Sequence, residues 1–351
     1  MQRSSLALCL VLACGFDLNS DPIGETVEPD DGTMPGPDET AIDPDHGGEG
    51  CAASPEALAD CIDVDRYASD LRFIANPRAP GSEHWRDVQD MCADRLTEAG
   101  YVVERHGYAT GTNVIGTKAG SSSATEVVLV SAHYDHIGDC PGADDNATGV
   151  AAALEVGRVL ALADLPRTVM IACWDEEEVS LRGSDAFAAS IEGRGIDIVV
   201  NFNFDMIGFA SSEPETQTIP APIYELFPDA AADIVANDRR ADFILVVTNA
   251  SAETAAVDLI AQADRIALNT TLLDVPAGME LSELYADTRR SDHASLWAAG
   301  YPAVLLTDTA DLRNSHYHCK GGPDVVADLD DEFAVDVARA VAAASAVAAG
   351  M

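Results

Sequence analysis

Basic residues are scarce in this sequence. Lys and Arg together number 20 among 351 residues, whereas Asp and Glu number 60, and the formal net charge at pH 7 is −40. A surface this acidic repels nucleic acid and anionic membranes, so neither is expected as a partner. The same charge favours solubility and indicates no particular fold.

The sequence also lacks an apolar run long enough to cross a bilayer as a helix. Residues 1–14 are predicted to be a targeting segment, because Arg3 precedes the short apolar run 6–13. Within it, Val11-Leu12-Ala13-Cys14 resembles a bacterial lipobox, whose cysteine becomes the lipidated first residue of the mature protein. The alternative is an ordinary signal peptide with a chance cysteine. Either interpretation predicts an extracytoplasmic protein: a lipoprotein whose lipid anchor is its membrane contact, or a secreted or periplasmic protein.

No C-x-x-C zinc knuckle occurs among the eight cysteines. Export would bring the chain to an oxidising compartment, where some cysteines should pair. Cys51 and Cys61 flank a short segment, and Cys140 and Cys319 lie beside two motifs described below, so both pairs are candidate disulfides. Two further cysteines are predicted to be buried apolar positions, one on a helix and one on a strand: Cys92 and Cys173.

Two parts follow the targeting segment. Residues 15–50 carry eleven acidic residues and no Lys or Arg, and their Pro and Gly content predicts a solvated linker. Residues 51–351 are predicted to form one folded domain. Apolar residues make up 47% of the chain, which is enough to build a substantial core.

Strand and helix patterns alternate along the predicted domain. Buried strands are predicted at 125–132, 168–173, 196–203, 242–248 and 301–306. Helices are predicted at 55–74, 83–99, 148–162, 253–267 and 331–348. This alternation predicts an α/β fold, a three-layer sandwich with a central mixed, mostly parallel sheet flanked by helices. The less regular segment 209–241 either shapes a substrate pocket or is a plain surface excursion.

Acidic and imidazole side chains follow three of these strands. The first strand ends in His133-Tyr134-Asp135, the second in the run 174–178, and the third in Phe204-Asp205. The loop 141–146, with two aspartates, lies between the first strand and its helix. Because sites in open α/β sheets form beyond the carboxyl ends of the strands, we expect these side chains to meet at one edge.

Carboxylates gathered in this way repel one another unless a positive charge binds them. Imidazole and carboxylate together are a donor set that suits Zn²⁺ or a similar first-row ion. Two ions that share a carboxylate can polarise a carbonyl group and lower the pKa of a water between them. A free carboxylate beside that water can then move its proton.

Five motifs in this order resemble a known family. They are His133-Tyr134-Asp135, the loop 141–149, the segment 177–184, Asn203-Phe204-Asp205-Met206 and Tyr317-His318. Together they resemble the dizinc aminopeptidases of the aminopeptidase S and aminopeptidase Y kind, whose relatives include glutamate carboxypeptidases and glutaminyl cyclases. The resemblance covers residues 63–345 and implies a zinc-dependent exopeptidase fold of the phosphorylase/hydrolase-like type. One such motif alone is a weak signal, whereas five in order at predicted strand ends are specific.

The resemblance implies two zinc ions per chain. His133 and Asp205 would bind one ion, Glu178 and His318 would bind the other, and Asp144 would bridge the two. The motif alignment favours Asp144 over its neighbour Asp145, which would then be a charge at a helix N-terminus. The bond between these two aspartates is often cis in the family.

Three further residues receive roles from the resemblance. Glu177 would be the general base and then the acid for the leaving amine. Asp135 would orient His133 by accepting its second ring hydrogen. Tyr317 would donate a hydrogen bond to the tetrahedral oxyanion.

The last zinc ligand has competitors. His318 is preferred over His293 and His316, with the segment 291–293 as its support. The family pattern is Tyr-His-Thr followed closely by Asp, but here Cys319 replaces the threonine and the next aspartate is further away. His136 is interpreted as a surface or loop residue.

Four functions are compatible with these residues. The preferred one is an aminopeptidase whose substrates are peptide or protein N-termini. A carboxypeptidase or dipeptidase of the same fold would need a cation for the terminal carboxylate, and Arg289, Arg290 and Arg313 are candidates. A glutaminyl cyclase usually works with one zinc and lacks the His-x-Asp start, so His133 argues against it. A non-catalytic binding domain would not need to keep Glu177 with every ligand.

Overall fold

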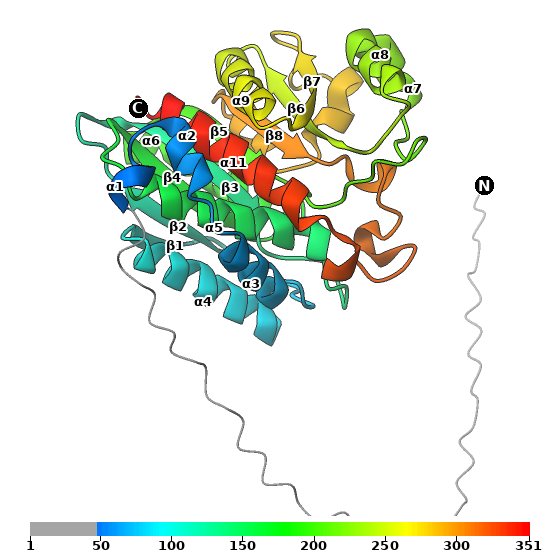
Figure 1. Ribbon diagram of the computed structural model, residues 1–351. Coiled ribbons are helices and arrows are strands. Elements are labelled where there is room, and N and C mark those ends of the chain that lie inside the picture. Colours follow the sequence, from blue (N-terminus) through cyan, green and yellow to red (C-terminus); the bar gives the residue numbers. More distant parts are fainter. Residues whose placement is uncertain (1–47) are drawn as a thin grey trace, which may run out of the picture. The chain divides into compact units, whose positions relative to one another are not determined.

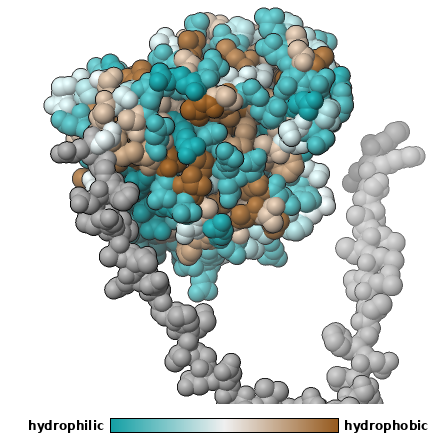
Figure 2. All heavy atoms as spheres, in the orientation of Figure 1, coloured by the Kyte–Doolittle hydropathy of each residue, from teal (hydrophilic) through white to brown (hydrophobic). Residues whose placement is uncertain are grey.

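The computed structural model describes residues 48–351 (Figure 1). The predicted targeting segment 1–14 and nearly all of the predicted linker 15–50 lie outside the described residues. Among the helices of residues 48–351, none combines the length and the apolar composition that a membrane span requires. Figure 2 shows mainly hydrophilic residues over one face of this part, with smaller apolar patches among them.

An eight-stranded mixed sheet runs through the centre in the order β1-β2-β4-β3-β5-β8-β6-β7. The strands are β1 Val102–Gly107, β2 Thr112–Lys118, β3 Ser123–His133, β4 Arg167–Trp174, β5 Asp197–Phe204, β6 Phe243–Asn249, β7 Asn269–Val275 and β8 Ala303–Thr307. The central strands β4, β3, β5 and β8 are parallel neighbours. Antiparallel pairing occurs in β1–β2, β2–β4 and β8–β6. The predicted mixed, mostly parallel sheet is therefore confirmed.

Helices cover both faces of the sheet. They are α1 Gly48–Cys51, α2 Pro55–Asp60, α3 Val64–Ile74, α4 Glu83–Glu98, α5 Gly149–Leu160, α6 Arg182–Arg194, α7 Ala221–Leu226, α8 Pro228–Ala236, α9 Glu253–Arg265, α10 His293–Ala298 and α11 Asp331–Ala348. In Figure 1, α3, α4, α5 and α11 lie over the near face, and α6 lies behind the sheet.

The central strand β3 shows why three layers form. Val128 and Val130 pack into the core under α5 and α11, whereas Val127 and Leu129 pack into a second core on the opposite face. Successive side chains of a strand point to opposite faces, so a strand that is apolar at every position needs cover on both sides. Each such side chain contributes about 1.5–3 kcal/mol on full burial.

The structure differs from the predicted elements in one helix that is split and in several elements that were not predicted. The predicted helix 55–74 is two helices, because the chain turns at Cys61 and Asp63 caps the second helix by accepting a hydrogen bond from the Arg66 amide at 3.0 Å. Strands β1, β2 and β7 and helices α1, α6, α7, α8 and α10 were not predicted. β1 is an edge strand with mostly exposed side chains, so it lacks the apolar signal that identified the central strands.

Both candidate disulfides are present, Cys51–Cys61 and Cys140–Cys319. Cys92 and Cys173 are buried free thiols, as predicted. The short bridge closes the turn beside α2, and the long one joins two loops at the carboxyl edge of the sheet. The second therefore belongs to the region where the acidic motifs meet.

Candidate metal centre

Three adjacent parallel strands deliver the predicted side chains to one edge. In the order β4-β3-β5, the strands end at Trp174, His133 and Phe204. The residues that follow β4 and β5 include Glu177, Glu178 and Asp205. The expectation that these motifs meet beyond the carboxyl ends of the strands is confirmed.

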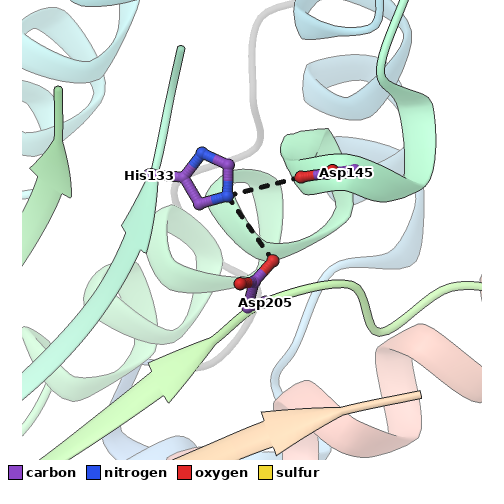
Figure 3. Close-up of side chains that lie close together, drawn as sticks. All are labelled: His133, Asp145 and Asp205. Carbon is purple, nitrogen blue, oxygen red and sulfur yellow. Dashed lines mark ion pairs between the residues drawn. The ribbon is translucent and has the colours of Figure 1, made fainter. Parts of the chain in front are cut away.

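The first set of converging atoms surrounds the ring of His133. Its Nε2 lies 3.4 Å from Oδ1 of Asp145 and 3.4 Å from Oδ1 of Asp205. Figure 3 shows the histidine at the end of its strand, with the two carboxylates approaching the same ring nitrogen from a helical turn and from the next strand. The imidazole is 1% exposed, so these carboxylates approach it away from bulk water.

The second set contains His318 and Glu178. Nε2 of His318 lies 3.1 Å from Oδ2 of Asp145 and 3.3 Å from Oε2 of Glu178. The two oxygens of the Asp145 carboxylate thus face different imidazoles. This carboxylate lies in the position that a ligand shared by two ions would take.

The prediction that Asp144 holds this shared position is wrong. Asp144 faces away from both sets, where its Oδ1 accepts a hydrogen bond from the Gly208 amide at 3.0 Å and its Oδ2 accepts one from Asn314 at 2.9 Å. The backbone at Asp145 leaves helical geometry, with φ −101° and ψ 96°, so adjacent side chains enter different surroundings. The cis peptide bond is Asp145–Asn146, not Asp144–Asp145.

The spacing of the two sets fits zinc. Ligand atoms that each lie about 2.0 Å from a tetrahedral Zn²⁺ are about 3.3 Å from one another. The four imidazole-to-carboxylate distances here are 3.1, 3.3, 3.4 and 3.4 Å. Imidazole nitrogen and carboxylate oxygen are also the donor atoms that zinc takes in hydrolytic sites. The residues present can therefore hold two such ions with Asp145 between them.

The pKa shifts of the ligand side chains also indicate that this centre can hold cations. Burial alone would raise the pKa of Asp145, but the neighbouring His136, His133 and His318 outweigh burial and hold that pKa well below its usual range. Burial would lower the pKa of His318, but Asp145 and Glu178 outweigh it and raise that pKa to about 9. The carboxylates thus stabilise positive charge on the rings between them. A divalent cation would satisfy the same demand.

Asp135 lies beside His133, but its contacts differ from the prediction. Nδ1 of His133 is nearer to the main-chain oxygen of Asp135, at 3.2 Å, than to its carboxylate, at 3.6 Å. The carboxylate accepts hydrogen bonds from the amides of Glu177 and Glu178, at 3.0 and 3.3 Å. Asp135 therefore fixes the segment that carries both glutamates, as well as the tautomer of the histidine.

Glu177 belongs to neither ligand set but borders the first. Its Oε2 lies 4.0 Å from Nε2 of His133, farther than either ligand carboxylate of that set. Its carboxylate also lines an open pocket. This position suits a group that exchanges a proton with a water or a substrate.

His136 lies in the loop after β3, as one of the two predicted alternatives has it, but it is not at the surface. Its ring is fully buried, and its Nδ1 lies 2.8 Å from Oε1 of Glu178 and 3.9 Å from Oδ2 of Asp145. The ring also meets the ring of His318 edge-on, with centroids 5.7 Å apart. His136 therefore contacts the Glu178 oxygen that does not face His318, and it is a further imidazole beside the second set.

Arg78 is a buried residue that the sequence did not single out. Its guanidinium donates hydrogen bonds to the main-chain oxygens of Tyr134, Pro141, Gly142 and Asp145, at 2.8, 2.6, 2.8 and 3.1 Å. One side chain thus ties together the loops after β3. No motif surrounds it in the sequence, and only the folded loops show what it binds.

A pocket of about 280 Å³ opens beside both ligand sets. Its wall is largely apolar and comes from α7, β6, β7, β8 and the turns between them: Pro220, Pro222, Ile223, Leu226, Phe227, Leu245, Val247, Leu273, Leu284, Tyr285 and Leu305. Segment 209–241 contributes the first five of these residues. Of the two alternatives left open for this segment, the structure therefore supports a part in shaping a pocket.

Tyr317 lies at the junction of the pocket and the second set. Its ring stacks on that of His318, with centroids 3.8 Å apart, and its hydroxyl lies 3.4 Å from a guanidinium nitrogen of Arg290. Burial, together with the charge of Asp145, raises the pKa of the Tyr317 hydroxyl. The hydroxyl therefore keeps its proton and can donate it to a hydrogen bond.

The competing histidines lie outside the two sets. His293 is buried and its Nε2 donates to the main-chain oxygen of Thr288 at 2.8 Å, and burial lowers the pKa of its ring to about 4. His316 pairs instead with Asp328, 2.8 Å away. In the segment 291–293, Ser291 accepts a hydrogen bond from Asn203 at 2.9 Å, so part of this segment supports the end of β5.

Known proteins are similar in sequence to parts of this chain. A family model described as Peptidase family M28 matches residues 113–345. YfbL of Escherichia coli (strain K12) is 30% identical over 207 residues, which are 56% of this chain and 59% of that protein. Aminopeptidase YwaD of Bacillus subtilis (strain 168) is 34% identical over 101 residues, which are 28% of this chain and 22% of that protein. The chain spans about half the length of the first curated relatives it matches.

Solved structures share the fold. The LapA aminopeptidase of Legionella pneumophila matches with a TM-score of 0.62 over 85% of this chain and 75% of that chain, at 16% sequence identity. At this identity the likeness describes the architecture: a mixed sheet flanked by helices.

Proposed function

The chain belongs to peptidase family M28, and we propose that it is a two-zinc aminopeptidase for peptides whose first residue has a large apolar side chain. His133, Asp205 and Asp145 would hold one ion, and Glu178, His318 and Asp145 the other. When bound, the two ions supply a polarised substrate carbonyl and a water of lowered pKa. The two disulfides support the further proposal that the protein works outside the cytoplasm.

The chain's own residues then carry the proton transfers. Glu177 takes a proton from the attacking water and delivers it to the amine that leaves when the peptide bond breaks. Tyr317 donates its hydroxyl proton in a hydrogen bond to the oxygen that becomes negative in the tetrahedral state. Asp135 holds the Glu177 amide at 3.0 Å, so the base stays on the pocket side of His133.

One observation carries the choice of an aminopeptidase: the pocket next to the ligand sets ends in an apolar wall. A substrate held with its first carbonyl at the centre would place its first side chain in this wall. Its free amine would then lie beside the carboxylates of Glu177 and Asp205, which line the same pocket. An ammonium group is favoured there by charge, whereas a terminal carboxylate is repelled.

The observation that favours the second candidate, a carboxypeptidase, is that Arg290 lines the pocket, where its cation could bind a terminal carboxylate. Its guanidinium lies 3.2 Å from Asp311, so an acidic partner is already present. Arg289 pairs with Glu283 at 3.5 Å. Arg313 is buried and bonds to main-chain oxygens, including that of Phe243 at 3.0 Å, so its role is structural. The aminopeptidase remains the better supported function.

Blocking the amine of the substrate separates these two functions. We expect a peptide with a free amine to be cut at its first bond, and the N-acetylated form of the same peptide to be cut at least about 100-fold more slowly, because the missing charge costs several kcal/mol beside two carboxylates. Mass spectrometry of the products identifies the bond. Release of the last residue from both peptides at equal rates would instead establish a carboxypeptidase.

The pocket wall predicts the preferred side chain. Each buried CH₂ group contributes about 0.8 kcal/mol, so a leucyl substrate should exceed an alanyl substrate by about 10-fold to 100-fold in kcat/KM. Leu273→Ala removes part of the wall and should lower this ratio several-fold. Its neighbour Leu272 is exposed, is not part of the wall and is the matched control, so Leu272→Ala should leave the ratio unchanged. Equal rates for alanyl and leucyl substrates with the wild type would contradict the assignment of the pocket.

A further inference from the structure

The Cys140–Cys319 disulfide joins the two loops that carry Asp145 and His318. Cys319 directly follows His318 in sequence, and Cys140 precedes the Pro141-Gly142 turn that leads to Asp145. The two cysteines are 179 residues apart along the chain. The bridge thus links a ligand of the second set to the loop of the shared carboxylate.

Apart from the disulfide and the contacts of His318 with the second ligand set, the middle of the His318 loop meets the rest of the fold through two side chains: His316 pairs with Asp328, and the Tyr317 hydroxyl lies 3.4 Å from Arg290. The main-chain amides of Cys319, Lys320 and Gly321 donate to oxygens of the same loop, on His316, Tyr317 and Ser315. The backbone is left-handed at both His318, with φ 55°, and Cys319, with φ 56°. This conformation is unfavourable for residues with a Cβ atom, so surrounding contacts must hold it in place.

The ends of the loop are held firmly. Asn314 donates its side-chain amide to Asp144 at 2.9 Å. The carboxylate of Asp324 accepts hydrogen bonds from the amides of Asp144 and Asp145, each at 3.1 Å. Between these two anchors, the bond from Cys319 to Cys140 is the covalent link to the Asp145 loop. The Asp324 amide also contacts the Cys319 sulfur at 3.5 Å, so the bridge borders the second anchor.

Resting on the proposed two-zinc function, we infer that the Cys140–Cys319 disulfide is a positioning element of the second ligand set. It holds His318 in its left-handed conformation, with Nε2 3.1 Å from the shared carboxylate. The first set depends on it less, because His133 and Asp205 stand at the ends of β3 and β5. Opening the bridge therefore weakens the second zinc position selectively.

The Cys51–Cys61 disulfide is the matched control, because it lies beside α2 and touches neither ligand set. The full chain is compared as wild type, Cys140→Ser/Cys319→Ser and Cys51→Ser/Cys61→Ser, each loaded with zinc and dialysed against a weak chelator. We expect two zinc ions per chain in the wild type and in the Cys51 control, and one in the Cys140 variant. Titration against a competing chelator should show the second ion bound about 10-fold to 100-fold more weakly.

Reduction of the native protein provides a second measurement that needs no variant. A phosphine reductant transfers two electrons to the S–S bond, the sulfurs take two protons from water to become thiols, and the phosphine leaves as its oxide. Cys319 is half-buried and Cys140 is buried, so the phosphine has to reach the bond from the Cys319 side. We expect reduced wild type to keep its far-UV circular dichroism and release one zinc, and the Cys140→Ser/Cys319→Ser variant to release none on the same treatment.

The outcomes separate the inference from the function on which it rests. A wild type that binds no zinc under saturating supply contradicts the proposed function. A wild type with two ions whose zinc affinity is unchanged by loss of the Cys140–Cys319 bridge, by substitution and by reduction, contradicts the inference alone. Equal loss of both ions while circular dichroism is retained also contradicts it, because the bridge would then not act on the second position in particular.

Discussion

Glu177→Gln is expected to lower kcat by about 10²-fold to 10⁴-fold while zinc content stays at the wild-type level. A general base of this kind contributes about 10²-fold to 10⁴-fold, and glutamine cannot accept the proton of the attacking water. Zinc should remain, because Glu177 stands outside both ligand sets, with its nearest oxygen 4.0 Å from the ring nitrogen of His133. Steady-state kinetics and metal analysis of the same preparation measure the two effects.

Glu176→Gln is the matched control for this substitution. Glu176 is the preceding residue in the chain, is buried, and accepts a hydrogen bond from the hydroxyl of Thr110, which an amide oxygen can also accept. Its kcat should remain within a few-fold of the wild type. A near-normal rate in the Glu177 variant would show that another residue moves the proton, and loss of zinc from that variant would make Glu177 a ligand.

The second large effect is expected from the pair Asp144 and Asp145. Asp145→Asn removes the negative charge that the shared carboxylate divides between the two sets and replaces one of its oxygens by an NH₂ group that binds no cation. We expect this variant to lose at least one zinc per chain and to fall below about one thousandth of wild-type activity. Zinc content by atomic emission and kcat are the measurements.

Asp144→Asn has a different expected result. Asp144 accepts hydrogen bonds from Gly208 and Asn314, and asparagine keeps one acceptor oxygen for them. We expect zinc content to be unchanged and the free energy of unfolding to fall by about 1–3 kcal/mol. The reverse result, with zinc lost from the Asp144 variant and kept by the Asp145 variant, would contradict the position that the structure gives to Asp145.

The sequence predicted the strand ends that form the centre, but it did not predict which of these two aspartates faces the centre. The strands before His133 and Asp205 were identified by their apolar runs, and the parallel order of the sheet then fixed where their ends meet. The choice between Asp144 and Asp145 depends on backbone angles within one irregular turn. The φ of −101° and ψ of 96° at Asp145 turn its side chain to the centre, and no residue type in the motif encodes them.

Arg78 and His136 were missed for a related reason. Arg78 binds six main-chain oxygens, four of them in the segment after β3, and a sequence motif does not show which main-chain atoms a side chain will bind. His136 directly follows the His-x-Asp motif, and no residue pattern around it indicated its burial. It is buried because the loop of Gly142 folds back over it, and a Cβ atom at that glycine would lie 2.5 Å from the His136 ring. Both positions depend on contacts between loops that are distant in sequence.

The central claim is that two cations share the carboxylate of Asp145. Anomalous X-ray diffraction from crystals of the zinc-loaded protein, recorded on both sides of the zinc absorption edge, tests it most directly. The account predicts two anomalous peaks on either side of Asp145, one facing His133 and Asp205 and the other facing Glu178 and His318. A single peak, or two peaks of which either lies on Asp144 and not on Asp145, would contradict it.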